Sequence, residues 1–331
     1  MSVFVGIDVA AGSFDLVCRR NGKNDKAETF PQTAEGHARA VRKLQALQPT
    51  CIVLEATGIY YLDLALALHE ADLPVCVINP RSFRHFAEVT LRGSKTDPLD
   101  AALLAEYAER MTPRRWTPPP PIFRQLRDLG RHLNRLLHAR TQAKNHRHAL
   151  QARRGVWKLL IEDTEEGIAQ LNRRIERLQK AAQALIQQAS ELKEQQAHLC
   201  AATGIAAASS LALLAELCTL PKDLKANQVV RHAGLDVRLH ESGSSVHRPG
   251  RLAKTGNAYL RGALYMPAMV AIVRDPYAKA FYNALVARGK KKIQALCAVM
   301  RKYLTGIWAC LQTGKPFDSS KLFSDQHLKI A

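Results

Sequence analysis

The first eighty residues limit the fold most strongly, because strand and helix signals alternate there in one definite order. Seven elements are predicted, in the order strand, strand, strand, helix, strand, helix and strand, at residues 3–7, 14–18, 27–30, 34–47, 51–54, 60–71 and 75–78. The pair Asn79-Pro80 is expected to end the last strand. Three early strands followed by this alternation describe a mixed sheet flanked by helices, which suits a ribonuclease-H-type α/β fold.

The rest of the chain is predicted to be mostly helical. A helix at 97–110 is entered through Thr96 and Pro98, and the proline run 118–121 then marks a stiff boundary. Residues 122–196 contain almost no glycine or proline and repeat leucine at helical spacing. They predict a long helical hairpin or coiled coil that is broken near Gly155.

A small helical domain is expected from about His198 to the end of the chain. A basic loop rich in glycine and serine, 240–256, interrupts it, and a further helix is predicted at 293–311. The expected domains are therefore 1–115, 122–196 and 197–331.

The charge of the chain points to a polyanionic partner. The formal net charge is +19 and the isoelectric point is about 9.9, an excess that few monomeric metabolic enzymes carry. Twelve lysines and arginines lie between Arg110 and Arg154 with Asp128 as the one acid, so this segment supplies +11 of the total. Binding through it should depend strongly on salt. A basic surface that serves only solubility is the alternative.

The cysteines and the hydropathy pattern predict a cytoplasmic protein without a membrane partner. The seven cysteines are scattered singly and form no C-x-x-C pair, which argues against a disulfide framework or a thiolate zinc site. The chain opens directly on a predicted strand, and its longest apolar run, 205–215, falls far short of a bilayer span.

Four acids are candidates for a metal site. Asp8 and Glu55 each follow an apolar strand, while Asp97 and Asp100 are three residues apart and therefore share a helix face. Carboxylate oxygens suit Mg²⁺, or a similar cation such as Mn²⁺, and two such ions could activate a nucleophile and stabilise a leaving oxygen in phosphodiester chemistry.

Each acid also has a structural interpretation. Asp97 could be the N-cap of its helix with Asp100 at the third helical position, and Asp8 and Glu55 could be turn residues that end strands. An Asp97→Asn variant separates these interpretations, because asparagine caps nearly as well but is a poor metal ligand.

A second candidate site is the segment Glu241 to Ser245, which carries Ser242 and is followed by several cations. A serine among cations could attack a phosphodiester, but no general base stands nearby in the sequence. By itself this segment is more typical of a phosphate-binding loop. The residues predicted to contact nucleic acid are Arg110, Arg114, Arg115, Arg124, Arg127, Arg131, Arg135, Arg140, Lys144, Arg147, Arg248, Arg251, Lys254, Arg261, Lys290, Lys291 and Lys292.

Nearly the whole chain resembles one family, the DEDD transposases of bacterial insertion sequences known as the "one-hundred-and-ten" family, which includes the bridge-RNA-guided recombinases. The matching segments, in order, are Val5–Asp8, Leu54–Tyr60, Val77–Pro80, Lys95–Ala101, Ala233–Leu235, Glu241–Ser245, Lys254–Gly256, Leu260–Arg261 and Ala263–Ala268. The resemblance implies a RuvC-like domain, a coiled-coil segment and a C-terminal transposase domain.

The same resemblance implies roles for individual residues and for partners. The metal ligands fall on Asp8, Glu55, Asp97 and Asp100, and the nucleophile, which would form a covalent serine–DNA intermediate, falls on Ser242. The active site pairs the acids of one subunit with the serine of another, so at least a dimer is implied, and a tetramer, as a dimer of dimers, for two DNA duplexes. A guide (bridge) RNA from the element pairs with donor and target DNA in the bacterial cytoplasm, at the nucleoid.

Three rival interpretations stay open at this stage. A metal-dependent nuclease or junction resolvase of the same fold would use Ser242 only to bind phosphate. A non-catalytic nucleic-acid scaffold would lose nothing when Asp8 or Glu55 is replaced. An actin-like ATPase shares the Gly-Ile-Asp strand, but a second glycine-rich phosphate loop is missing from the sequence.

Overall fold

The computed structural model describes residues 2–56, 58–90, 96–242 and 246–323, and the chain divides into two compact units. The boundary lies inside the proline run, with Met1–Pro118 in one unit and Pro119–Ala331 in the other.

The N-terminal unit is an α/β structure built on one mixed sheet. Its elements are β1 (Val3–Val9), β2 (Ser13–Arg20), β3 (Lys23–Asn24), β4 (Glu28–Pro31), α1 (Ala34–Leu47), β5 (Cys51–Glu55), α2 (Tyr61–Glu70), β6 (Val75–Ile78), α3 (Pro80–Val89) and α4 (Asp97–Met111). The sheet order is β3-β2-β1-β5-β6, and β4 also pairs with β2. β2 is antiparallel to β1, whereas β5 and β6 run parallel to it and to each other. The predicted mixed sheet flanked by helices is confirmed.

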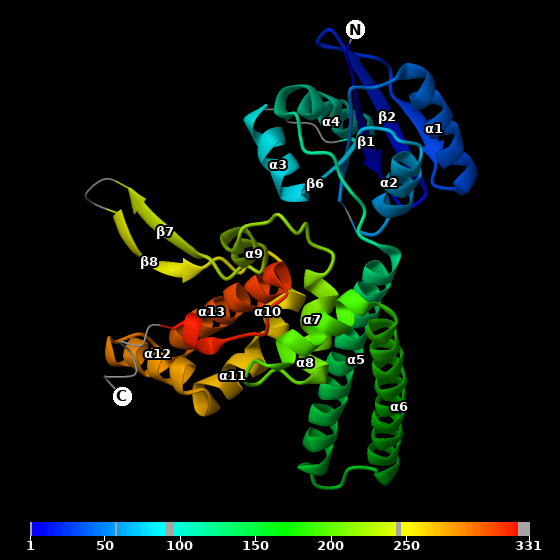
Figure 1. Ribbon diagram of the computed structural model, residues 1–331. Coiled ribbons are helices and arrows are strands. Elements are labelled where there is room, and N and C mark those ends of the chain that lie inside the picture. Colours follow the sequence, from blue (N-terminus) through cyan, green and yellow to red (C-terminus); the bar gives the residue numbers. More distant parts are fainter. Residues whose placement is uncertain (1, 57, 91–95, 243–245, 324–331) are drawn as a thin grey trace. The chain divides into compact units, whose positions relative to one another are not determined.

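Helices cover both faces of this sheet (Figure 1). On one face, Val5 and Ile7 of β1 pack with Leu44 of α1 and Leu64 of α2. On the other face, α4 lies across β1, β2 and β5, and α3 packs beside it. β1 is buried on both sides, which explains why its sequence is almost continuously apolar.

Two local features of this unit were missed from the sequence. The short strand β3 was not predicted, and Asn79-Pro80 was interpreted only as a break. In the structure Pro80 begins α3, and the side-chain oxygen of Asn79 accepts a hydrogen bond from the Arg81 amide at 2.8 Å. The pair ends a strand and also starts a helix, because asparagine is a good N-cap and proline fits the first helical turn.

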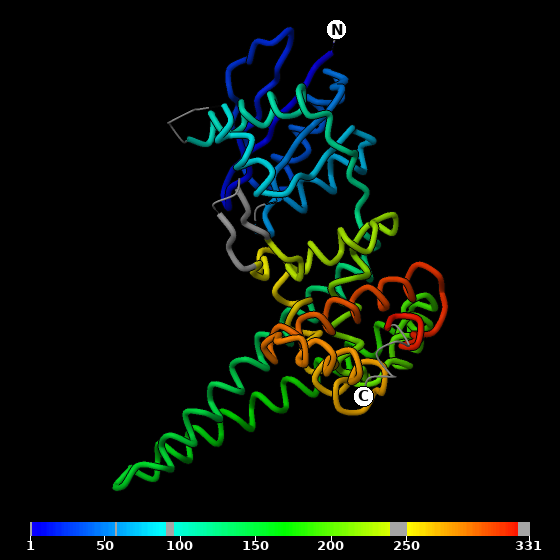
Figure 2. The backbone as a smooth tube through the Cα atoms, turned by 90° about the vertical axis from the view of Figure 1, so that its left-hand side faces the viewer, coloured from blue at the N-terminus to red at the C-terminus, as the bar shows by residue number. Residues whose placement is uncertain are grey.

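The second unit begins with two long helices that pack against each other along their length. They are α5 (Pro121–Gln151) and α6 (Lys158–Gln188), and the turn between them contains Gly155. The tube in Figure 2 shows this pair projecting from the other helices of the same unit. The break predicted near Gly155 is the turn of this hairpin.

The remaining elements of the second unit are mostly short helices. They are α7 (Ser190–Cys200), α8 (Ala207–Leu217), α9 (Ala226–His232), β7 (Val237–Ser242), β8 (Val246–Leu252), α10 (Ala258–Ala263), α11 (Tyr265–Arg274), α12 (Pro276–Ala287), α13 (Lys292–Thr313) and the 3-10 helix η1 (Ser319–Lys321). One core joins them to the base of the long helices, since Leu126 and Leu133 of α5 belong to the same buried cluster as Leu213 of α8 and Tyr303 of α13.

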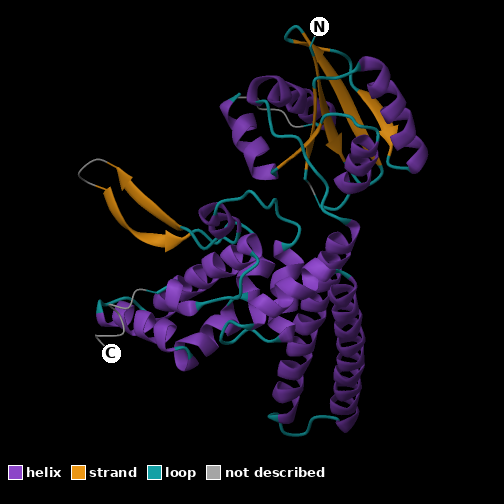
Figure 3. Ribbon diagram, in the orientation of Figure 1, coloured by secondary structure: helices purple, strands orange, loops and turns teal. Residues whose placement is uncertain are grey.

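The predicted basic loop at 240–256 is largely a β-hairpin, which corrects the sequence interpretation. β7 and β8 pair antiparallel with a bulge between Arg238 and His240, and they stand out as the strands of this unit in Figure 3. The Gly, Ser and Pro content of the segment suggested a loop. Pro249 is nevertheless compatible with an isolated two-stranded ribbon, because either strand of such a ribbon has an unpaired edge.

All seven cysteines are free thiols, in agreement with the absence of a predicted disulfide framework. In the part of the chain that the structure describes, every helix is too short or too polar to cross a lipid bilayer.

Candidate active site and nucleic-acid interface

Two neighbouring parallel strands bring Asp8 and Glu55 to the same edge of the sheet. Ile7 of β1 pairs with Leu54 of β5, so the acid that follows each of them leaves the sheet at the same level. Both carboxylates are half-buried. The register therefore delivers two acids together from apolar strands, as the sequence pattern predicted.

Helix α4 brings the other two acids to this edge through a very close contact with β1. A methyl group added at Gly6 would lie 2.1 Å from the carbonyl oxygen of Ala101 and 2.2 Å from the amide nitrogen of Ala105. The backbone of α4 therefore rests directly on the backbone of β1, two residues before Asp8. Asp97 and Asp100 lie in the first turn of this helix. Only glycine leaves room for such an approach.

The electrostatics of Asp8 show that the other three acids act on it. Burial and the charges of Asp100, Asp97 and Glu55 raise the pKa of Asp8 to about 6. Burial is the largest cause, and the three carboxylates follow it in that order. A carboxyl group shifted by desolvation together with three like charges is typical of functional sites.

The structure rules out one interpretation of Asp97. The helix begins at Asp97, and its N-cap is Thr96, whose side chain makes no capping hydrogen bond. Asp97 is the first helical residue rather than the cap, so capping does not explain its presence.

The four carboxylates fit a divalent cation in chemistry. Among the residues that the structure describes, no group of three or more His, Cys, Asp or Glu side chains is gathered closely enough to hold one ion. The donor set nevertheless consists of hard carboxylate oxygens. Burial and the charges of the other three acids raise the pKa of Asp8, and a bound cation would relieve the repulsion part of this effect.

A fifth acid, Asp15, was missed from the sequence. It lies opposite Asp8 in the β1–β2 register, so both side chains are on the same face of the sheet. Asp15 is buried, and the hydroxyl of Thr29 donates a hydrogen bond to it at 2.5 Å. The alternation of β2 could have placed Asp15 on this face, but its hydrogen bond gives it a structural partner.

Ser242 is the last residue of β7, and it pairs with Val246 of β8. The side chains of Ser242 and Arg248 lie outside the described residues, as do residues 243–245 of the predicted serine-rich segment and Lys95 of the predicted acidic segment. The backbone places Ser242 at the end of a hairpin strand rather than in an open loop.

The two chain segments that enter and leave this hairpin, 232–236 and 253–257, are hydrogen-bonded together, and we call them the hairpin foot. Three backbone amides on the second segment donate to carbonyls on the first: Ala253 to Asp236 at 2.9 Å, Lys254 to Gly234 at 3.0 Å and Asn257 to His232 at 2.7 Å. Two side chains, Arg261 to the Ala233 carbonyl and Arg238 to the Thr255 hydroxyl, add further bonds.

Arg124 and Arg127 are half-buried, and the other predicted nucleic-acid contacts whose side chains are described fall into two groups. The cations of one group already have partners inside the protein: Arg110 with Glu106, Arg131 with Glu216, Arg140 with Asn172, Arg147 with Glu165 and Arg261 with the Ala233 carbonyl. Cations of the other group, including Arg135, Lys144, Arg251, Lys290, Lys291 and Lys292, are exposed to solvent. The exposed cations are therefore better candidates for contact with phosphate than the cations that already have partners.

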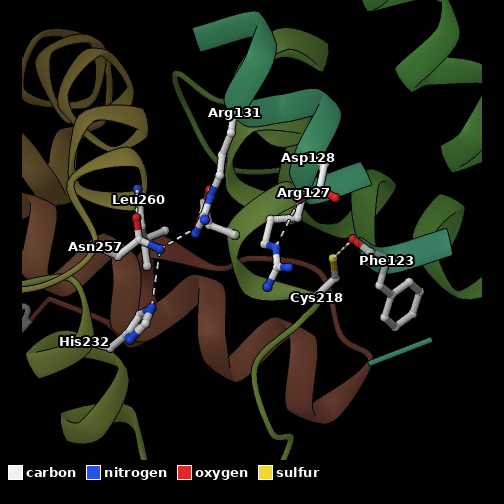
Figure 4. Close-up of polar contacts among 9 residues, drawn as sticks. Phe123, Arg127, Asp128, Arg131, Cys218, His232, Asn257 and Leu260 are labelled. Atoms are coloured by element: carbon white, nitrogen blue, oxygen red, sulfur yellow. Dashed lines mark hydrogen bonds and ion pairs between the residues drawn. The ribbon is translucent and has the colours of Figure 1, made fainter. Parts of the chain in front are cut away.

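A polar cluster around the buried carboxylate of Glu216 lies where α5, α8, α9 and α10 meet (Figure 4). The Arg131 guanidinium donates to both carboxylate oxygens of Glu216, at 2.7 and 2.8 Å, and stacks on the ring of Tyr259 at 5.1 Å. The amide nitrogen of the Asn257 side chain donates to the same carboxylate at 2.5 Å and lies 3.4 Å from Nε2 of His232. Hydrogen bonding to Glu216 raises the pKa of Arg131, whereas burial lowers the pKa of His232.

Sequence reasoning did not find this cluster, and it interpreted Arg131 only as a cation of the basic segment. Arg131 and Glu216 are 85 residues apart in the chain, so no local spacing links them. The one available signal was Glu216 itself, an acid inside the apolar run of α8.

Comparison with known protein families matches two segments of the chain. Residues 5–153 match a family model described as a transposase, of the DEDD type of IS110, and residues 196–283 match one described as the transposase of the IS116/IS110/IS902 family. The first segment contains Asp8, Glu55, Asp97 and Asp100, and the second contains Ser242.

Among curated proteins, the chain is similar over almost its full length to two pilin gene-inverting proteins. It is 28% identical to that of Moraxella bovis, over 95% of this chain and 97% of the relative, and 28% identical to that of Moraxella lacunata over the same shares. An uncharacterised 43.6 kDa protein of the insertion element IS110 from Streptomyces coelicolor is 30% identical, over 28% of this chain and 23% of its own length.

Among solved structures, Thermus thermophilus RuvC in complex with a Holliday junction substrate is similar, at 18% identity and a TM-score of 0.28, over 35% of this chain and 99% of RuvC. A second RuvC structure from the same organism gives 19% identity and the same TM-score.

The matched family segments and the full-length relatives define a DNA-recombining enzyme of the transposase class. Within that class, the chain belongs to the IS110 family of transposases.

Proposed function

We propose that this chain is an RNA-guided DNA recombinase that cuts and rejoins DNA through a covalent bond between Ser242 and a DNA phosphate, assisted by metal-binding acids. The observation that carries the proposal is a group of four acids, three of which raise the pKa of the fourth, Asp8, within the segment matched by the DEDD transposase model. The serine hairpin in the second matched segment supplies the other half of the proposed site.

In this proposal Asp8, Glu55, Asp97 and Asp100 hold a divalent cation, Mg²⁺ or Mn²⁺. When bound, the cation supplies Lewis-acid stabilisation of the charge that develops on phosphate oxygens. The acids themselves fix the cation beside the sheet edge, and the backbone contact between Gly6 and α4 fixes the acids. Asp8 must be ionised to serve as a ligand, so its raised pKa makes metal binding compete with a proton.

The proposed chemical step balances without an oxidant or a reductant. The Ser242 oxygen forms a bond to phosphorus, the bond from phosphorus to one deoxyribose oxygen breaks, and the serine proton leaves to a base as the deoxyribose oxygen gains one. Attack by a hydroxyl of another strand then reverses these changes, rejoins the DNA and regenerates the serine. The phosphodiester bond between serine and DNA retains the energy of the DNA bond that was broken, so rejoining needs no nucleotide cofactor.

The cations supply binding rather than bond breaking. Exposed residues such as Arg135, Lys144, Arg251 and Lys290–Lys292 would contact phosphates of donor and target DNA and of a guide RNA encoded by the element. Gene inversion, the activity in the names of the two Moraxella relatives, would be the same exchange performed on two sites of one DNA molecule. Work on chromosomal DNA places the protein in the bacterial cytoplasm, at the nucleoid.

The acids and the serine act from different subunits in this proposal. A homodimer then provides two complete sites, and two DNA duplexes brought together need a dimer of dimers. Mixing an Asp8→Asn subunit with a Ser242→Ala subunit tests this arrangement, since a composite site regains activity in the mixed dimer and a site within one chain does not.

The decisive experiment is a search for the covalent adduct. The protein is purified with its co-purifying RNA, which is sequenced, and is incubated with labelled DNA that matches the guide and with Mg²⁺. Denaturing electrophoresis should show a protein–DNA adduct that Ser242→Ala abolishes and that EDTA prevents. Cleavage without an adduct in the wild type would instead indicate a metal-dependent nuclease. Recovery of only random RNA fragments would contradict RNA guidance and leave the serine chemistry standing.

A further inference from the structure

The ion pair between Arg131 and Glu216 joins a partly exposed guanidinium to a buried carboxylate. The side chain of Glu216 is 3% exposed, and both of its oxygens are held by the Arg131 guanidinium. A buried ion pair adds little net stability, because desolvation offsets the attraction, and apolar residues of similar volume often replace it without loss. What such a pair does provide is a fixed geometry between the elements that carry it.

The two helices that carry the pair, α5 and α8, are in close contact next to it. A methyl group added at Gly130 would lie 2.5 Å from the Cβ atom of Ala215, so α5 and α8 touch at the residues that immediately precede Arg131 and Glu216. This contact brings the guanidinium and the carboxylate together without a gap. The pair therefore fixes the position of the basic helix α5 relative to α8 in the core of the second unit.

Asn257 extends this connection to the hairpin foot. Its side-chain oxygen caps α10 by accepting from the Leu260 amide at 3.0 Å, a task that serine or aspartate performs equally well. Its side-chain nitrogen donates to Glu216 and contacts His232, and its backbone amide donates to the His232 carbonyl. Asparagine supplies a cap and two donors at one position, whereas aspartate supplies no donor and serine supplies one.

The backbone next to Asn257 is packed too tightly to adjust independently. Gly256 has a φ of 147°, and a methyl group there would lie 2.3 Å from the His232 carbonyl oxygen. The hairpin foot therefore moves as one piece with Asn257. Glu216 and Arg131 in turn fix Asn257 to α5, so the chain of contacts runs from the basic helix to the base of β7 and β8.

We infer that Asn257, acting through Glu216 and Arg131, is a positioning residue that sets the hairpin bearing Ser242 relative to the basic helix α5. Nucleic acid bound along the exposed cations of α5 would then meet the hairpin at a fixed register. This inference rests on the proposed function for the role of Ser242, but the contacts that position the hairpin foot exist independently of it. The cluster touches no reacting atom and acts through the serine strand.

The first test replaces Asn257 by serine in the full chain and compares it with a matched N-cap change. Serine keeps the cap and removes the side-chain amide that reaches Glu216 and His232. Asp275→Ser is the control, because Asp275 is a buried N-cap that also bonds a second group, the Tyr303 hydroxyl, yet lies at the start of α12, outside the hairpin foot. Exchange of the backbone amides at positions 253, 254 and 257 should rise about tenfold in Asn257→Ser and stay unchanged in Asp275→Ser.

The second test separates positioning from support of the fold. In the double variant Arg131→Met/Glu216→Leu an apolar pair replaces the ion pair, and its unfolding temperature should stay near that of the wild type. If the cluster positions the hairpin, the rate of adduct formation at saturating DNA falls at least about tenfold in both this variant and Asn257→Ser, while DNA affinity changes much less.

The outcomes are distinguishable. A double variant that recovers both stability and adduct formation overturns the inference, since the cluster would then serve the fold alone. Exchange at the hairpin foot that is the same in Asn257→Ser as in Asp275→Ser also overturns it. An adduct that persists in Ser242→Ala disproves the proposed nucleophile instead, while the exchange measurement still reports on the positioning contacts.

Discussion

Replacing Asp8 by asparagine should make the metal-free protein more stable while removing a ligand that the proposed reaction needs. The folded structure raises the pKa of Asp8 from 3.8 to about 6, through burial and the charges of Asp100, Asp97 and Glu55. Above this pKa the ionised carboxylate is held among like charges, and asparagine has the same shape without the charge.

The size of the effect follows from the pKa difference. Each pKa unit corresponds to 1.36 kcal/mol, so the full shift is worth roughly 3 kcal/mol. Because Asp8 is half-buried, solvent screening reduces this value, and we expect a gain of about 1–3 kcal/mol. The folded state binds the proton more tightly than the unfolded state, so the destabilisation is complete above pH 6, declines as the pH falls through 6, and is gone below 3.8.

Amide exchange of β1 and β5 in EDTA measures this gain within the N-terminal unit. After correction for intrinsic rates, Asp8→Asn should exchange about 5- to 150-fold more slowly than the wild type at pH 8, and the difference should shrink at pH 4.5. Mg²⁺ should slow exchange in the wild type more than in the variant. Asp63→Asn, an exposed acid on α2, is the control and should change little. A variant that is less stable than the wild type at pH 8, or a gain that stays constant down to pH 4.5, would refute the electrostatic reasoning.

Three further predictions concern the proposed site and the charge of the chain. Gly6→Ala should push α4 away from β1, because the added methyl group meets the helix backbone. Urea unfolding should show an unfolding free energy lower by about 1–3 kcal/mol, and single-turnover kinetics a strand-transfer rate about 100-fold lower. A wild-type rate would disprove the backbone contact. Asp97→Asn should leave stability within about 1 kcal/mol, because Thr96 is the N-cap, while metal-dependent cleavage falls sharply; retained cleavage would exclude Asp97 as a ligand. Replacing Lys290–Lys292 by glutamine should weaken DNA binding and reduce the slope of log affinity against log salt by about 2–3, and an unchanged slope would show that these lysines do not contact phosphate.

The sequence was informative wherever the local spacing of apolar residues was enough to determine the secondary structure. The order of strands and helices in the first unit followed from alternating runs of apolar residues, and the parallel pairing of β1 with β5 then placed Asp8 beside Glu55. Spacing alone put Asp97 and Asp100 on one helix face, but it could not separate a cap from a ligand. The backbone angles of Thr96 place the cap one residue earlier, while the metal-ligand role of both acids stays a prediction.

Features that depend on distant residues could not be predicted in the same way. Nothing local marks Gly6 as the point where α4 rests on the sheet, because the clashing atoms belong to Ala101 and Ala105. The partner of Arg131 lies on another helix, so an arginine bound inside the protein was indistinguishable from its solvent-facing neighbours. The hairpin was hidden because glycine, serine and proline signal a loop, although a two-stranded ribbon tolerates all three.

The contact between Gly6 and α4 also gives the acidic edge a mechanical property. Backbone packed against backbone has no rotamers through which it can yield, and close-packed protein interiors compress very little. Helix α4 therefore behaves as a rigid lever whose first turn carries Asp97 and Asp100. Near its other end, Glu109 is joined to Arg19 of β2 by an ion pair of 2.6 Å. Because Asp97 and Asp100 share the first turn of this helix, any displacement of α4 would move both carboxylates together relative to Asp8.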